Sequence, residues 1–201
     1  MLLTALARCD FCKLLYRIPT DPPAFGQRFY QDAYSQGFTT DCPSPETLKE
    51  LVARAFAGTP KDFTEKVEIL DSLGVPKGCM ILDFGASWGY GSWQLQEAGY
   101  HVVGFEVSKA RARYAREMLR QEVVDDPELL KGPFDVFFSS HVLEHLPSPR
   151  DAFGLASRLV RPNGLLVAFT PNGSLQRLRE KATHHQVWGM AHPLCLAAAE
   201  K

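Results

Sequence analysis

The sequence lacks an apolar run long enough to cross a bilayer, which takes roughly 20 consecutive residues. Its first residues, 1–8, lack the basic start and the length of a secretion signal. Neither sign of charge dominates, because 22 Lys and Arg stand against 23 Asp and Glu. No global field therefore favours nucleic acid or an anionic membrane. We expect a cytoplasmic protein, with no membrane partner and no nucleic acid, that acts on a small or locally docked substrate.

Cysteine is scarce, with five residues in the chain. The number is odd and most of the cysteines are isolated, which argues against a disulfide framework and for a reducing compartment. Cys9 and Cys12 form a C-x-x-C pair, half of a zinc ribbon, which needs a second pair at a suitable distance. Only Cys42 follows before Cys79, so we expect no bound zinc.

From residue 79 onward, short apolar runs alternate with helical segments, which is typical of parallel strands joined by helical crossovers. Before them, residues 1–43 predict an irregular N-terminal arm. Apolar spacing predicts two helices within 44–74, with Ser44 as the N-cap of the first and Asp62 as the N-cap of the second. The expected strands span 80–84, 101–106, 122–124, 134–139 and 164–170, with helices over about 90–98, 109–120 and 149–160. Right-handed crossovers predict an α/β fold with one open, doubly wound, Rossmann-like parallel sheet. We expect the strand order 3-2-1-4-5, which reverses beside the first strand. Such sheets bind ligands at the carboxyl ends of their strands.

The first strand of this sheet runs into a glycine-rich turn, Asp83-Phe84-Gly85-Ala86-Ser87-Trp88-Gly89-Tyr90-Gly91. Glycine in such a turn lets the backbone approach a ligand closely. A dinucleotide site would have a second glycine where Ser87 stands, so the pattern disfavours NAD. A phosphate-binding Walker loop would end in Gly-Lys followed by Ser or Thr, and Tyr90 and Gly91 occupy that region instead.

The spacing Asp83-x-Gly85-x-x-x-Gly89 after an apolar strand resembles motif I of the class I S-adenosylmethionine-dependent methyltransferases. The resemblance implies S-adenosylmethionine as cofactor and S-adenosylhomocysteine as product. It places the glycine loop under the methionine part and Asp83 at the ammonium group. Glu106 stands 21 residues after Gly85, where the family holds both ribose hydroxyls with an acidic residue. A carboxylate suits a diol because it can accept two charge-assisted hydrogen bonds.

For the adenine amino group the family uses an acidic residue after the third strand, and Asp125 or Asp126 fits that position. We favour Asp125, although Asp before Pro is also ordinary turn chemistry. The expected cofactor-binding residues are thus Asp83, Phe84, Gly85, Ala86, Ser87, Gly89, Glu106, Val107, Asp125, Ser140 and His141.

A second motif follows the fourth strand, where residues 134–147 end in His141-Val142-Leu143-Glu144-His145-Leu146-Pro147. It resembles the family's fourth motif with the trailing "LEHL" of a broad group that includes ubiquinone-biosynthesis O-methyltransferases and sugar methyltransferases. We expect His141, Glu144 and His145 to be the catalytic residues. His141 is the candidate general base, because a neutral imidazole can take a proton from an acceptor hydroxyl.

Three other interpretations of this motif have to be weighed. An inverted zinc-peptidase motif would need both histidines on one long helix, which Pro147 and Pro149 prevent. Glu144 and His145 could instead be structural and anchor the loop. They could also hold a divalent ion with His184 or His185, as similar runs do in small-RNA terminal 2′-O-methyltransferases. We expect no metal, and both the structural role and the metal-binding alternative stay open.

The end of the chain departs from the family pattern, since no apolar strand pair follows the fifth strand. The C-terminal antiparallel pair of the family is therefore expected to be missing, which leaves an exposed edge that could be the seam of a homodimer. A short helix is expected over 174–182, and residues 184–193 resemble the loop that covers the acceptor in relatives. We divide the chain into the arm, 1–43, and a methyltransferase domain, 44–201, with its core at 79–175 and its tail at 176–201.

The predicted activity is transfer of a methyl group, by in-line displacement, to a small-molecule or sugar acceptor. The rival interpretations are a catalytically silent module that binds S-adenosylmethionine and an NAD-dependent oxidoreductase, the latter disfavoured by Ser87.

Overall fold

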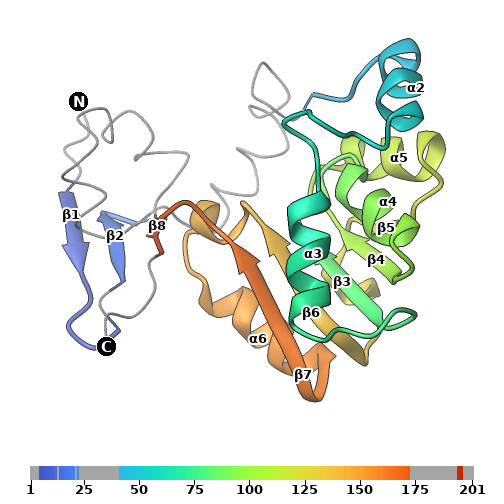
Figure 1. Ribbon diagram of the computed structural model, residues 1–201. Helices are drawn as coiled ribbons and strands as arrows, with labels where there is room; N and C mark the ends of the chain where they lie inside the picture. Colours follow the sequence, from blue (N-terminus) through green and yellow to red (C-terminus); the bar gives the residue numbers. More distant parts are fainter. Residues whose placement is uncertain (1–4, 13, 21, 23–40, 173–193, 197–201) are drawn as a thin grey trace.

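Five parallel strands form the central sheet of the computed structural model, which describes residues 5–12, 14–20, 22, 41–172 and 194–196 (Figure 1). The strands are β3 (Met80–Phe84), β4 (His101–Phe105), β5 (Val123–Val124), β6 (Phe134–Ser140) and β7 (Val160–Phe169). They lie side by side in the order β5-β4-β3-β6-β7, which confirms the predicted order 3-2-1-4-5. The first predicted strand is thus central, and its carboxyl end lies between those of β4 and β6.

Helices cover both faces of this sheet, as a doubly wound fold requires. The helices are α2 (Pro45–Ala53), α3 (Thr64–Ser72), α4 (Tyr90–Glu97), α5 (Lys109–Met118) and α6 (Arg150–Leu159), with 3₁₀ turns η2 (Pro127–Leu129) and η3 (Leu143–His145). Apolar residues of α3 and α4 pack on one face, and those of α6 pack on the other. No helix in the described ranges is long and apolar enough to cross a membrane.

The ends of the helices follow local chemistry. Ser44 caps α2, because its Oγ accepts the N–H of Thr47 at 3.2 Å. The predicted cap of α3, Asp62, lies one residue before the N-cap, Phe63. Its Oδ1 still accepts the Thr64 N–H at 2.9 Å. The carboxylate therefore satisfies a free donor of the first helical turn, which is the purpose of a cap.

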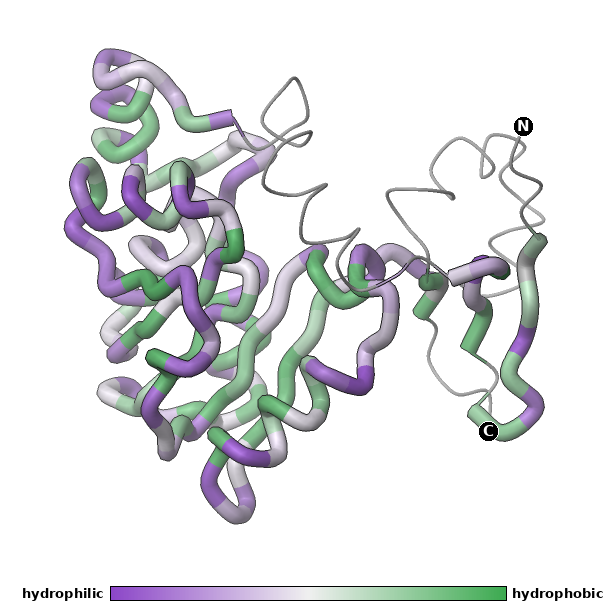
Figure 2. The backbone as a smooth tube through the Cα atoms, turned by 180° about the vertical axis from the view of Figure 1, so that it is seen from behind, coloured by the Kyte–Doolittle hydropathy of each residue, from purple (hydrophilic) through white to green (hydrophobic). Residues whose placement is uncertain are grey.

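Strand β6 shows why the chain forms a sheet here. Its sequence FDVFFSS is a nearly continuous apolar run, and Val136, Phe137 and Phe138 are each at most 1% exposed. Phe137 belongs to the cluster packed under α6, while Phe138 belongs to the cluster under α3 and α4. A strand buried on both faces has no polar side, which is why the run does not alternate. In Figure 2 the middle strands are accordingly coloured hydrophobic, whereas the helices alternate.

A second, small sheet corrects the expectation of an irregular N-terminal arm. Strands β1 (Ala5–Arg8) and β2 (Leu15–Ile18) form an antiparallel hairpin, and β8 (Leu194–Cys195) pairs with β2 (Figure 1). The hairpin closes through the Cys9 N–H, which donates to the Leu14 carbonyl at 2.8 Å. Strands of four residues, paired with a segment from the far end of the chain, give no local signal. The helix predicted over 174–182 and most of the tail lie outside the described residues.

Candidate functional site

The glycine loop after β3 is held against the end of β4 by its own backbone. The N–H groups of Gly85 and Ala86 both donate to the carbonyl of Phe105, at 2.8 and 2.9 Å. Gly85 has φ 88°, and a Cβ built on it would lie 2.2 Å from Cγ2 of Val142. No residue other than glycine fits there without displacing the chain, so the loop and the segment after β6 are in direct contact.

Glu106 joins the glycine loop to the start of α5. Its Oε2 accepts the N–H of Ser87 at 2.9 Å, and its Oε1 accepts the N–H of Ser108 at 2.8 Å. Burial raises the pKa of this carboxyl, and the Ser108 N–H and the nearby Arg111 guanidinium act in the opposite direction. Each oxygen has accepted one backbone bond and keeps capacity for another, as the expected contact with two hydroxyls requires.

Asp83 lies below the loop and is 3% exposed. Its Oδ2 accepts the hydroxyl proton of Ser92 at 2.7 Å. The pKa of Asp83 is raised to about 6, chiefly by burial; the hydrogen bond from Ser92 opposes this rise, and the negative charge of Glu106 adds to it. Two buried carboxyls that are close enough to interact disfavour each other's ionised form. A ligand group that carries a positive charge or a hydrogen-bond donor would therefore stabilise the ionised carboxyls.

Ser87 combines two unusual features within the same loop. Its φ is 53°, in the left-handed region that non-glycine residues adopt with strain. Its hydroxyl is buried and has no hydrogen-bond partner among the described residues. Strained residues with unused polar groups are characteristic of ligand sites.

The other expected cofactor residues differ in their surroundings. The ring of Phe84 stacks on Phe105 with centroids 5.3 Å apart, so its side chain belongs to the core. Asp125 follows β5 and pairs with Arg116 at 3.4 Å, whereas Oδ1 of Asp126 accepts the Glu128 N–H at 2.9 Å in the turn of η2. Asp125 as an adenine-binding residue stays a prediction, as does the role of Val107, which packs partly buried against the core.

The segment after β6 is built differently. His141 has φ 56° and donates its backbone N–H to the Phe169 carbonyl at 2.8 Å, which ties the ends of β6 and β7 together. Its side chain is 60% exposed, whereas that of Glu144 is 3% exposed. His141 Nδ1 lies 3.4 Å and His145 Nε2 4.0 Å from the same oxygen, Oε1 of Glu144. The three predicted catalytic residues are therefore adjacent, with Glu144 between the two imidazoles.

Some residues near the carboxyl ends of the strands could not be recognised from the sequence as part of the site. Ser92 lies on α4, nine positions after the carboxylate it holds, and Val142 is an apolar residue inside a polar motif. Ser139 is fully buried at the end of β6, and its hydroxyl has no partner in the described part of the chain. Spacing alone does not identify such residues, because their roles depend on which side chain lies opposite.

Trp88 belongs to the core and not to a ligand wall. It is 1% exposed and lies in an aromatic cluster with Phe56, Tyr90 and Tyr114. This cluster packs α2 and α5 against the glycine loop. The tryptophan therefore stabilises the loop from behind.

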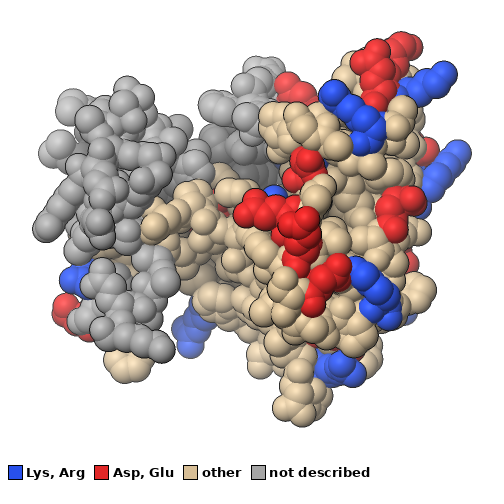
Figure 3. Space-filling view, in the orientation of Figure 1, with Lys and Arg blue, Asp and Glu red and all other residues tan. Residues whose placement is uncertain are grey.

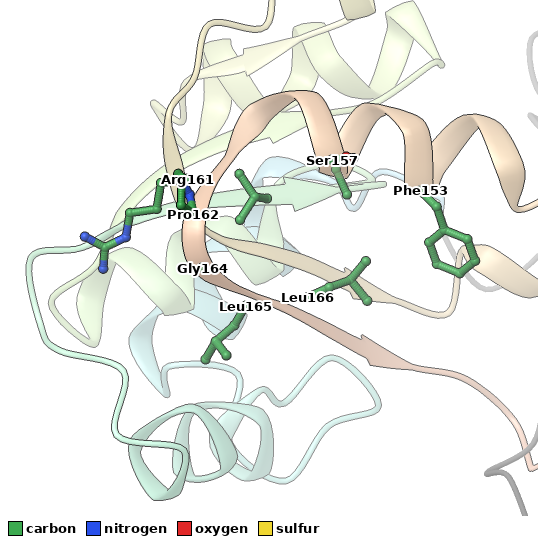
Figure 4. Close-up of a pocket in the computed structure, with 9 residues that line it drawn as sticks. Phe153, Ser157, Arg161, Pro162, Gly164, Leu165 and Leu166 are labelled. Carbon is green, nitrogen blue, oxygen red and sulfur yellow. The ribbon is translucent and has the colours of Figure 1, made fainter.

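A hollow of about 490 Å³ lies elsewhere, between α6 and the amino end of β7 (Figure 4). Its lining is mostly apolar, with Phe153, Leu165 and Leu166 among the residues drawn in that view. Arg161, its charged residue, pairs with Asp135 at 2.8 Å. The hollow lies away from the carboxyl ends of the strands and holds no titratable pair, so we do not assign chemistry to it.

No three His, Cys, Asp or Glu side chains within the described ranges are arranged to hold a metal ion. His184 and His185, the further ligands considered from the sequence, lie outside those ranges.

Comparisons with known proteins agree with this geometry. The family model of a methyltransferase domain matches residues 43–195 of the 201-residue chain. A ubiquinone biosynthesis O-methyltransferase of Alkalilimnicola ehrlichii is 32% identical over 114 residues, 52% of this chain and 46% of that protein. One of Maricaulis maris is 28% identical over 109 residues, 48% of this chain and 42% of that protein. The chain thus spans less than half the length of these two relatives.

Among solved structures, an S-adenosylmethionine-dependent methyltransferase of Aquifex aeolicus superposes with a TM-score of 0.50 at 19% identity. The alignment covers 66% of this chain and 76% of that chain. A putative methyltransferase of Methanococcus maripaludis gives a TM-score of 0.50 at 15% identity, covering 75% and 79%. At such low identity these likenesses concern the fold alone.

Proposed function

The chain belongs to the methyltransferase-domain family, class I enzymes that use S-adenosylmethionine, and on that premise we propose that it methylates a small-molecule or sugar acceptor. The observation that carries the proposal is the pair of buried carboxyls, Asp83 and Glu106, on either side of a loop that only glycine can form at Gly85. The similarity to ubiquinone biosynthesis O-methyltransferases supports an acceptor hydroxyl.

The residues present fit this cofactor. Gly85 leaves the space that a Cβ would fill, and Glu106 has one oxygen bonded to each flanking backbone N–H with capacity left for a diol. Asp83 supplies the negative charge that an amino group seeks, and the free hydroxyl of Ser87 offers a further hydrogen bond. We assign the amino acid end to Asp83 and the loop, the ribose to Glu106 and the adenine to Asp125.

When bound, S-adenosylmethionine supplies an electrophilic methyl group on sulfur. The protein then has to exclude water, align the acceptor with that methyl group and accept a proton from the acceptor. We assign the last task to His141, whose exposed imidazole lies at the carboxyl end of β6, beside the glycine loop that Val142 contacts.

The surface supports a small acceptor over an anionic polymer. Acidic side chains gather over α3 in Figure 3, and the exposed acids of this helix are Glu65, Glu68 and Asp71. Negative charge on this face would repel the phosphates of a nucleic acid.

Calorimetry with S-adenosylhomocysteine and, separately, with NADH tests the cofactor. We expect binding of the first ligand alone, and binding of NADH alone would overturn the proposal. Turnover against a panel of phenols, catechols and sugars, compared with His141→Asn, tests the reaction. Asn is the matched replacement because it tolerates positive φ. Binding of S-adenosylhomocysteine with no turnover on any acceptor would instead favour a silent binding module.

We also propose that β7 is a seam between two copies of the chain. It ends the sheet formed by the described residues, and Leu165 and Leu166 are 38% and 44% exposed. A monomeric mass in light scattering at micromolar concentration would reject this proposal.

A further inference from the structure

Glu144 is a buried carboxylate without a hydrogen-bond donor in the described part of the chain. It lies on η3, its side chain is 3% exposed, and neither Oε1 nor Oε2 accepts a hydrogen bond there. An unpaired charge in such a position is costly unless a cation or a donor faces it. Because this buried charge lowers the stability of the folded state, a stabilising role does not account for Glu144.

The groups that face it are two imidazoles. His141 Nδ1 lies 3.4 Å and His145 Nε2 4.0 Å from Oε1. Nδ1 of His141 faces the buried carboxylate, and because the whole side chain is 60% exposed, we infer that the other ring nitrogen, Nε2, is the one exposed to solvent. The exposed nitrogen is the one that an acceptor can reach.

The backbone holds this arrangement in place. His141 has φ 56° and bonds to the Phe169 carbonyl, so it is fixed between the ends of β6 and β7. A left-handed conformation at a non-glycine residue costs roughly 1–3 kcal/mol and persists only where the surroundings enforce it. The backbone of His141 is therefore fixed at a position where its imidazole lies beside the carboxylate of Glu144.

We propose that Glu144 is a positioning residue: it accepts the Nδ1 proton of His141 and so leaves the Nε2 lone pair directed at the acceptor. In a histidine, the hydrogen bond at one ring nitrogen decides which nitrogen carries the proton. The catalytic meaning of this inference rests on the proposed function. As the acceptor oxygen bonds to the methyl group and the methyl–sulfur bond breaks, the acceptor proton moves to Nε2. The resulting imidazolium then faces the carboxylate of Glu144.

The tautomer of His141 can be measured directly by ¹⁵N–¹H correlation of the histidine side chains of the full chain. The spectra are taken at pH 9, well above the ordinary histidine pKa of about 6.5, so that the rings are neutral. His141→Asn identifies the signal. We expect the Nδ1–H form to predominate in the wild type and the ratio to invert toward Nε2–H in Glu144→Leu. In Glu144→Gln, whose amide oxygen is a weaker acceptor, the ratio shifts the same way but less, and in the exposed control Glu128→Gln it does not change.

A predominant Nε2–H form in the wild type, or the same ratio in wild type and both Glu144 variants, would overturn the inference. Leucine is close in size to glutamate, and apolar replacement of a buried charge is often tolerated. Should Glu144→Leu fail to fold, Glu144→Gln decides alone, and an unchanged ratio there counts against us. The wild type, the two Glu144 variants and Glu128→Gln are also titrated with S-adenosylhomocysteine, and we expect dissociation constants within twofold of each other. Loss of binding in the wild type would defeat the proposed function while leaving the tautomer result intact.

Discussion

The loop after β3 and the segment after β6 touch through Gly85 and Val142, yet their buried carboxyls differ in their hydrogen bonds. In the first region each buried carboxyl accepts a protein hydrogen bond, Asp83 from Ser92 and Glu106 from two backbone N–H groups. In the second region Glu144 accepts none in the described residues. On the proposed function, the difference means that the proposed cofactor end of the site is preformed by the fold, whereas the proposed acceptor end depends on two imidazoles.

The largest effect is expected from Gly85→Ala, which removes the preformed end. The new Cβ would lie 2.2 Å from Val142 in a left-handed conformation, so the loop must move. We expect affinity for S-adenosylhomocysteine to fall more than roughly 100-fold and the free energy of unfolding to drop by about 2–4 kcal/mol. Calorimetry and urea unfolding measure the two effects.

Gly58→Ala is the matched control for this change. Gly58 has φ 70° but nothing within 4 Å of the added Cβ, so only the backbone cost of about 1 kcal/mol remains. Equal losses in the two variants would show that contact with the segment after β6 does not shape the loop.

Glu106→Gln should be the next largest effect. The amide loses the charge that strengthens hydrogen bonds to hydroxyls and turns an N–H₂ group toward the backbone N–H of Ser87 or Ser108. We expect about 10- to 100-fold weaker binding of S-adenosylhomocysteine by calorimetry. Exposed Glu122→Gln is the control, and a Glu106 variant that binds as well as this control would remove the ribose assignment.

A pH dependence follows from the raised pKa of Asp83, about 6. A ligand ammonium favours the ionised carboxyl, so binding below this pH has to expel a proton. We expect affinity for S-adenosylhomocysteine to fall by up to about tenfold per pH unit as the pH drops below about 6. Asp83→Asn should flatten the profile of the calorimetric titrations, and an equally steep profile in that variant would exclude Asp83 as the group responsible.

In the absence of ligand, the same carboxyl makes the free energy of unfolding fall as the pH rises, whereas the affinity for the ligand rises with pH. The unfolded chain ionises Asp83 near pH 4, about 2 units before the folded chain does. Between these values the folded state binds more protons, so the free energy of unfolding falls as the pH rises and then levels off above about 6. Urea unfolding of Asp83→Asn should lack this decline.

The smallest effect is expected from Ser87→Gly, and its two parts have opposite signs. Glycine relieves the strain at φ 53° and should raise the free energy of unfolding by about 1 kcal/mol. Loss of the unpaired hydroxyl should weaken S-adenosylhomocysteine binding severalfold. A variant that is more stable and binds equally well would show that this hydroxyl does not contact the ligand.

Prediction from sequence succeeded where the signal was local. The apolar run of β6 and the glycines at 85 and 89 indicate a buried strand and a tight turn whatever surrounds them. It failed at β1 and β2, where four-residue strands depend on pairing with each other and with β8, near the other end of the chain. Asp62 shows the intermediate case, since its capping chemistry was predicted and its place relative to the helix start was off by one residue.

Residue spacing was sufficient to predict the strands and helices of a doubly wound sheet and the two motifs at its carboxyl edge, because periodicity and turn chemistry act over a few residues. Packing decided the rest: that Glu144 is buried between two imidazoles, that Val142 closes on Gly85, and that Trp88 supports the loop from behind. Which side chains are buried, and which of them face each other, depends on segments that are far apart in the chain. The desolvation that raises the pKa of Asp83 therefore exists only once those segments pack together.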